Sequence, residues 1–77
     1  MTYERLDRTL LPVLALAGTP LTAAQLRQRC SDPWAPSLVE EWLADAFERG
    51  LVNVRRTADL PSEWRLTKKG ERAAATR

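Results

Sequence analysis

The sequence predicts a small α+β domain, mainly helical, with three helices, a two-stranded β-hairpin and a short C-terminal helix. Apolar residues recur at helical spacing in three segments before residue 50, and they alternate with polar residues in two short segments after it. A chain of 77 residues can bury only about 60–65% of the surface that its unfolded form exposes. We therefore expect a single domain over residues 1–77 with a small core.

The first helix is expected over residues 3–17. Its apolar residues share one helix face: Leu6, Leu10, Val13, Leu14 and Ala17. Pro12 lies inside the segment and removes one backbone hydrogen bond, so either the helix is kinked, which we favour, or its regular part begins near Thr9. Leu11, Leu16 and Tyr3 lie off this face. They pack either on the C-terminal helix or on a second subunit.

The second helix is expected over residues 23–30. Thr22 stands three residues before Gln25, which is the spacing of a capping box. Cys30 is interpreted as a buried thiol, because a single cysteine cannot form a disulfide within the chain. The turn that follows contains Trp34, interpreted either as a lid on the core edge or as an exposed residue that binds a partner.

The third helix is expected over residues 37–49, with Ser37 and Glu40 as a second capping box. Its apolar face continues into the following segment: Val39, Trp42, Leu43, Ala46, Phe47 and Leu51. Gly50 stands where a glycine commonly ends a helix.

The hairpin is expected from two alternating segments, one with Val52 and Val54 and one with Trp64 and Leu66. Residues 57–62 between them are expected to form a loose, protruding loop, since no Asn-Gly turn is present. Thr67 then caps a last helix over residues 68–75.

The composition argues against an enzyme. There is no histidine and only one cysteine, and the three glycines are isolated, so a zinc site, a histidine-based triad and a glycine-rich phosphate loop are all missing. We expect no metal and no cofactor. No apolar run approaches the roughly 20 residues that cross a bilayer, and no signal-peptide pattern is present, so we expect a cytoplasmic protein with no membrane contact.

Charge is divided unevenly along the chain, although the net charge is only +2. Residues 37–50 carry a net −3, from Glu40, Glu41, Asp45 and Glu48 against Arg49. Residues 51–77 carry a net +4. The expected third helix is thus acidic and the hairpin region is basic.

Three motifs follow one another along the chain: L-T-A-A-Q-L at 21–26, L-A-D-A-F-E-R-G-L-V at 43–52 and W-R-L-T-K-K-G at 64–70. They resemble the L-T-x-x-x-L, L-x-x-L-x-x-x-G-L-V and Y-x-L-T-x-x-G signatures of winged helix-turn-helix regulators of the MarR and PadR type. The resemblance spans essentially the whole chain and implies a winged-helix fold.

The resemblance implies binding of double-stranded DNA, with the third helix in the major groove and the hairpin, or wing, on the neighbouring backbone or minor groove. The positions that match on the outer face of the helix are Ser37, Leu38, Glu41, Ala44 and Asp45. The DNA-binding residues implied are Ser37, Arg55, Arg56, Arg65 and Lys68. Cations of the wing fit phosphate binding, whereas carboxylates on the helix repel a polyanion. We therefore expect a transcriptional regulator that contacts DNA mainly through the wing.

An alternative interpretation is a protein-interaction module in which Glu41, Asp45 and Glu48 bind a basic protein partner. A further alternative is an accessory domain that assembles only with itself, as a homodimer through the first and last helices.

Overall fold

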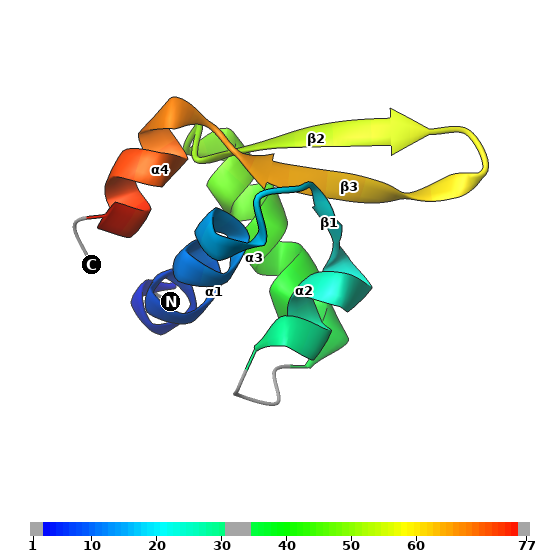
Figure 1. The fold of residues 1–77 in the computed structure, drawn as a ribbon. Helices are drawn as coiled ribbons and strands as arrows, with labels where there is room; N and C mark the ends of the chain where they lie inside the picture. Colours follow the sequence, from blue (N-terminus) through cyan, green and yellow to red (C-terminus); the bar gives the residue numbers. More distant parts are fainter. Residues whose placement is uncertain (1–2, 31–34, 76–77) are drawn as a thin grey trace.

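The computed structural model describes residues 3–30 and 35–75, which form an α+β fold with four helices and a three-stranded antiparallel sheet (Figure 1). In chain order the elements are α1 (Glu4–Ala17), β1 (Leu21–Thr22), α2 (Ala23–Arg29), α3 (Pro36–Glu48), β2 (Val52–Thr57), β3 (Leu60–Leu66) and α4 (Lys68–Ala75). The strands lie in the order β1-β3-β2. The hairpin of β2 and β3 projects away from the helices, and α4 lies at its other end.

Helix α1 confirms the first predicted helix, and Pro12 lies within it. The helix ends at Gly18, whose φ of 69° is left-handed. Leu11 is fully buried in the core, so it packs within this chain and not on a second subunit. Leu16 is 87% exposed.

Helix α2 begins with the predicted capping box. The Thr22 hydroxyl accepts from the Gln25 backbone N–H at 3.1 Å, and the Gln25 side chain accepts from the Thr22 N–H at 3.0 Å. Cys30 is half-buried rather than buried, and its thiol donates to the Leu26 carbonyl at 3.1 Å. The prediction for Trp34 lies outside the described residues.

The sheet has three strands where the sequence predicted two. Leu21 and Thr22 form β1, which pairs with Trp64 and Glu63 of β3. A strand of two residues carries no alternating pattern of its own. Its pairing exists only because the tertiary structure brings it beside β3.

The predicted capping box at Ser37 is wrong. Helix α3 begins one residue earlier, at Pro36, and its N-cap is Ala35, which makes no side-chain cap. Proline suits the first helical position because its fixed φ matches the helix and the N–H that it lacks would have no partner there. Glu40 therefore does not cap the helix, and its side chain is exposed.

The end of α3 is a Schellman motif centred on Gly50. The Leu51 N–H donates to the Ala46 carbonyl at 2.9 Å and the Gly50 N–H to the Phe47 carbonyl at 3.0 Å. Gly50 has a φ of 78°, which favours glycine. This motif turns the chain directly from α3 into β2.

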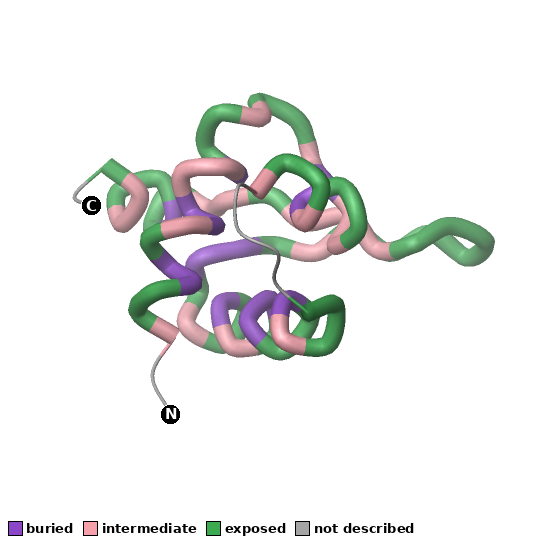
Figure 2. Tube along the Cα trace, turned by 90° about the horizontal axis from the view of Figure 1, so that it is seen from below, coloured by how far each residue is buried: buried purple, intermediate pink, exposed green. Residues whose placement is uncertain are grey.

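The hairpin is longer than predicted, because both strands extend into the segment expected to be a loop. Thr57 pairs with Leu60, so only Ala58 and Asp59 lie in the turn. The register is irregular between Arg55 and Thr57. Extended strands with an irregularity near the tip give a protruding, twisted arm, and Figure 2 shows that its outer part is exposed.

Thr67 joins the hairpin and α4 to the end of α3. Its hydroxyl accepts from the Gly70 N–H at 3.1 Å, as predicted for a cap, and donates to the Gly50 carbonyl at 2.6 Å. The Lys69 ammonium donates to the Arg49 carbonyl at 2.9 Å. The start of α4 is thus held against the end of α3.

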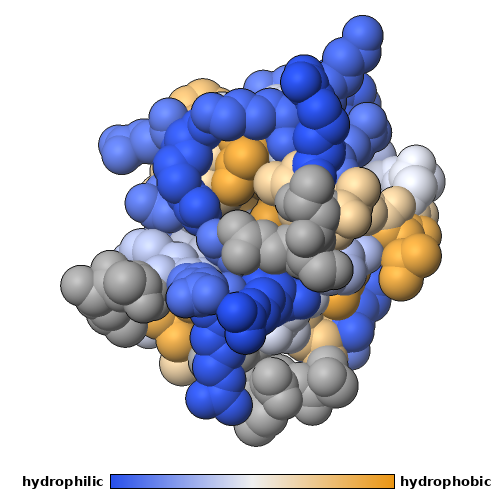
Figure 3. Space-filling model, turned by 90° about the vertical axis from the view of Figure 1, so that its left-hand side faces the viewer, coloured by the Kyte–Doolittle hydropathy of each residue, from blue (hydrophilic) through white to orange (hydrophobic). Residues whose placement is uncertain are grey.

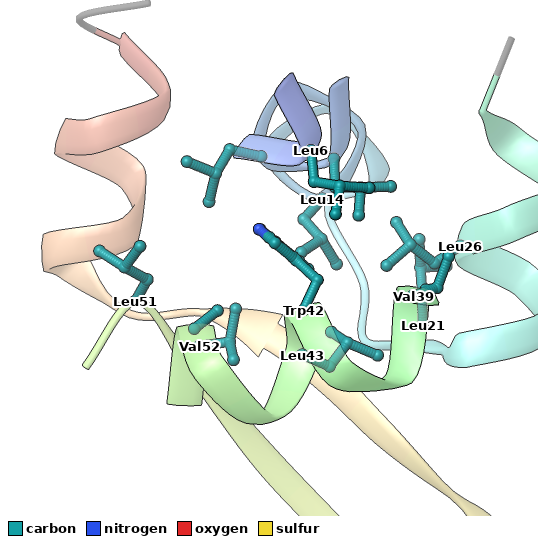
Figure 4. Packing of buried hydrophobic residues seen from close by; sticks show 12 residues of the cluster. Leu6, Leu14, Leu21, Leu26, Val39, Trp42, Leu43, Leu51 and Val52 are labelled. Atoms are coloured by element: carbon teal, nitrogen blue, oxygen red, sulfur yellow. The ribbon is translucent and has the colours of Figure 1, made fainter. Parts of the chain in front are cut away.

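The core lies between α1, α2, α3 and the base of the sheet (Figure 4). Trp42 is the largest fully buried side chain and stands at the centre of the cluster, between Leu6 and Leu14 of α1 and Val52 of β2. Phe47 was predicted on the apolar face but is 48% exposed. At 100° per residue it lies at the margin of that face, on the side of the hairpin.

A buried carboxylate joins α1 to α3. Asp7 is 4% exposed. It accepts from the Trp42 indole N–H at 2.7 Å and from the Arg49 guanidinium through two hydrogen bonds of 3.0 and 2.8 Å. The Arg49 Nε also lies 2.8 Å from a carboxylate oxygen of Asp45. Hydrogen bonding to Asp7 raises the pKa of Arg49 above its ordinary value, against the effect of partial burial.

Within the part of the chain that the structure describes, no helix combines the length and the apolar character that crossing a bilayer requires.

Replacing Asp7 with Asn should destabilise the fold by about 2–3 kcal/mol, because Arg49 then loses a bidentate charged partner in a buried site. Denaturant unfolding followed by circular dichroism measures this. The matched control is Glu4→Gln, which removes an exposed ion pair with Arg8 and should change stability by less than about 0.5 kcal/mol. Equal effects of the two changes would contradict the structural role of Asp7.

Replacing Gly70 with Ala should destabilise the fold by about 3 kcal/mol, because the added Cβ would overlap the backbone carbonyl of Leu51. Backbone oxygen in a closed junction cannot move aside as a flexible side chain can. Thermal unfolding compared with Glu71→Ala, an exposed neighbour on the same helix, isolates the steric effect from helix propensity. A stabilised Gly70→Ala variant would show that α4 is not packed on Leu51.

Candidate functional site

Three of the predicted DNA-binding cations lie near one another, two on the outer face of the sheet and one at the start of α4. Asn53 pairs with Arg65, and Arg55 lies two residues further along β2, so Arg55 and Arg65 point to the same face. Arg55 and Arg65 line one hollow. Arg65 and Lys68 line an adjoining hollow, whose volume is about 670 Å³. Arg55, Arg65 and Lys68, all exposed, are called the basic strip below.

Arg56 extends the cationic surface toward the tip of the hairpin. It is exposed and lies at the irregularity of the β2–β3 register, between Arg55 and Thr57. An irregularity lets two consecutive side chains depart from strict alternation. Arg55 and Arg56 are therefore both available to solvent near the outer part of the hairpin.

Two acidic residues lie beside the basic strip. Their closeness to these cations was not predicted from the sequence. Glu63 stands directly opposite Arg55 in the sheet register. Glu71 lines the same hollow as Arg65 and Lys68. These carboxylates offset part of the strip's positive charge, and only the strand register could reveal the pairing of Glu63 with Arg55.

The structure places Ser37 apart from the basic strip. Ser37 is the second residue of α3 and is exposed, and α3 begins at the end that lies away from the sheet (Figure 1). The five residues predicted to bind DNA therefore divide into four on the hairpin and the start of α4, and one at the far end of a helix.

The acidic residues of α3 have different environments. At 100° per residue, Ser37, Glu41 and Glu48 share the outermost ridge, and both glutamates are exposed. Asp45 instead turns toward α1, where it is half-buried and paired with Arg49. Leu38 is also half-buried against the core. The outer face predicted from the resemblance is thus narrower than expected, and Asp45 takes part in the network around Asp7.

A groove separates α3 from the hairpin. Its walls come from the start of α2, from α3 and from β3, and it measures about 520 Å³. Glu40 lies at this groove, and Ala44 and Leu43 form its α3 wall. The groove was not predicted from the sequence, because it arises only where the hairpin crosses the helix.

Figure 3 shows the side of the molecule formed by α1 and α4. Apolar areas are visible there among hydrophilic side chains. The homodimer through the first and last helices stays a prediction. Across residues 3–30 and 35–75, no three side chains of the metal-ligating types His, Cys, Asp and Glu gather in one place.

No family model and no curated protein matches this sequence. Among solved structures, the chain is similar to the crystal structure of AF1382 from Archaeoglobus fulgidus, with a TM-score of 0.68 and 19% sequence identity. The similarity covers 88% of this chain and 78% of that chain. At this identity the likeness concerns the fold alone.

Proposed function

We propose that this chain is a winged-helix DNA-binding protein, acting as a transcriptional regulator in the cytoplasm, and that its β2–β3 hairpin is the wing that contacts duplex DNA. The observation that carries the proposal is the exposure of Arg55, Arg56, Arg65 and Lys68 along one projecting hairpin and the helix start beside it. Four exposed cations, three on the hairpin and one at the start of α4, can each reach a phosphate.

The order of the elements supports the winged-helix interpretation. A helix pair, α2 and α3, precedes a hairpin that is followed by α4, which is the arrangement that the sequence motifs imply. In such domains the hairpin and the helix before it approach DNA together. The projection of the hairpin beyond the helical body agrees with this use.

Charge favours the hairpin over α3 as the main contact. The exposed ridge of α3 presents Glu41 and Glu48, which repel phosphates, and it offers no arginine or asparagine to the base edges. Contacts to phosphates position a protein without reading sequence. We therefore expect binding with little sequence preference and a strong dependence on salt.

A second candidate function is the binding of a basic protein partner on α3. It is favoured by the exposure of Glu40, Glu41 and Glu48 along that helix. Asp45, which the sequence analysis assigned to this surface, contributes less free charge because Arg49 neutralises it. Loss of a pull-down on Glu41→Lys together with Glu48→Lys, with DNA binding kept, would support this candidate over the first.

Charge reversal of the wing, Arg55→Glu with Arg56→Glu, should lower the affinity for a random duplex by at least about tenfold. Electrophoretic retardation or fluorescence anisotropy at low salt measures it. For the wild type, the logarithm of the binding constant should fall against the logarithm of salt with a slope of about −3 to −4, as expected for four phosphate contacts.

The matched control for this reversal is Arg29→Glu with Arg72→Glu, which changes the net charge equally at exposed residues outside the wing. It should weaken binding far less. If both reversals weaken binding to the same extent, the effect comes from net charge and the wing has no special part. No retardation of any duplex by the wild type at low salt would exclude the proposed function.

Replacing Glu63 with Gln should strengthen DNA binding, by about two- to fivefold, because a carboxylate opposite Arg55 repels phosphates and offsets the charge of the strip. The same anisotropy titration measures this gain. Glu4→Gln, which removes an acid on α1, serves as the comparison. Unchanged or weaker binding by Glu63→Gln would show that this face of the hairpin does not meet DNA.

A further inference from the structure

An aromatic ring is exposed beside the cations of the hairpin. Phe47, in the last turn of α3, is 48% exposed. It lines the same hollow as Arg55 and Arg65, and the volume of about 560 Å³ lies within the range of ligand pockets. Phe47 comes from the helix and both arginines come from the hairpin, so only the fold brings them together.

The same hollow also contains an amide and a carboxylate. Asn53 stands opposite Arg65 in the sheet and Glu63 stands opposite Arg55, so the four side chains share one face. An amide donates and accepts hydrogen bonds, and a carboxylate accepts them. An ionised phosphate has no N–H or O–H to give Glu63, whereas the edge by which a nucleobase pairs carries an N–H group. The hollow therefore suits a base together with its phosphates better than phosphates alone.

The two guanidinium groups of the hollow are available to a ligand. Arg55 and Arg65 are exposed, and across residues 3–30 and 35–75 neither lies within ion-pair distance of an acid. Arg65 also lines the adjoining hollow with Lys68. A nucleic acid strand that enters the first hollow thus has a further cation beside its path.

The ring of Phe47 has no use for a base that is paired within a duplex. Paired bases are stacked on one another and present only their edges in the grooves. An unpaired base offers its flat face, and stacking of such a base on an aromatic side chain strengthens binding by at least about fivefold. The exposed ring therefore distinguishes single-stranded from duplex DNA.

We propose that this chain binds duplex DNA with a single-stranded tail more tightly than blunt duplex DNA. An unpaired base of the tail stacks on Phe47, and Asn53 and Glu63 contact the edge of that base. Arg55 and Arg65 contact the neighbouring phosphates. The phosphate contacts rest on the proposed function, and the stacking contact adds the kind of DNA that the site takes.

Fluorescence anisotropy at low salt compares the affinities for a blunt duplex and for the same duplex with a short tail of thymines. The wild type should bind the tailed duplex at least about fivefold more tightly. Phe47→Ala should bind the two forms equally, and its affinity for the blunt duplex should stay within about twofold of the wild type, because no base of that duplex stacks on the ring.

Two further variants at this position separate stacking from apolar contact. Phe47→Trp keeps an aromatic face and should keep the preference for the tail. Phe47→Leu keeps an apolar side chain without that face and should lose the preference. The matched control is Leu16→Ala, which removes a side chain on α1 that is 87% exposed and should bind both forms like the wild type. Circular dichroism checks that each variant is folded.

The salt dependence of the preference tests its physical origin. The arginines contact phosphates in both forms of DNA, so the tail adds a stacking contact without adding a cation. The ratio of the two affinities should therefore not fall as salt rises over the range in which binding is measurable. A ratio that falls to unity would assign the preference to additional phosphates and overturn the role of Phe47.

The outcomes separate this inference from the DNA-binding function. Equal wild-type affinities for the two forms, or a preference that Phe47→Ala keeps, would overturn the inference while the DNA-binding function stands. Binding of neither form would reject both. Binding of the tailed duplex and of a thymine single strand, both lost in Phe47→Ala, without binding of the blunt duplex would sustain the inference and reject duplex binding. Binding of polyglutamate that requires Phe47, with no preference for the tail, would assign the hollow to an acidic peptide and overturn the inference.

Discussion

The fold depends on one buried carboxylate. Asp7 would be costly to bury as an isolated charge, and it is tolerated because the Trp42 indole and the Arg49 guanidinium both donate to it. The two partners lie at the middle and the end of α3, so the carboxylate sets the rotation of α3 against α1 as well as its position. Asp45 then holds the other side of the guanidinium. Apolar packing alone, being non-directional, would leave that rotation less well defined.

With α3 fixed, the end of the helix determines where the hairpin goes. The Schellman motif at Gly50 turns the chain into β2, and Thr67 donates to the Gly50 carbonyl as the chain returns from β3. Gly70 allows α4 to lie against Leu51. Both ends of the hairpin are thus anchored at one junction, while its tip is free of the core. A firm base with an exposed tip is what a hairpin needs if it is to present charges to a partner.

The exposed charges of α3 are mainly acidic, and those of the β2–β3 hairpin are mainly basic. A basic surface lies beside an acidic one, so in the proposed function duplex DNA approaches the hairpin and not the exposed ridge of α3. Salt screens exposed charges of this kind, so we expect the proposed DNA binding to weaken as the ionic strength rises.

The sequence by itself determined the four helices, the two long strands and most of the core, because helical spacing, alternation, the Thr22 and Thr67 caps and Gly50 are local signals. It did not determine the start of α3, where Pro36 outweighed Ser37, nor the strand β1, which exists only through its pairing with β3. It also identified the cations of the hairpin. Only the tertiary structure decided that Arg55, Arg65 and Lys68 line adjoining hollows, that Asp45 is paired with Arg49, and that Asp7 is buried. These depend on strand register and on contacts between residues distant in sequence, which no local pattern encodes.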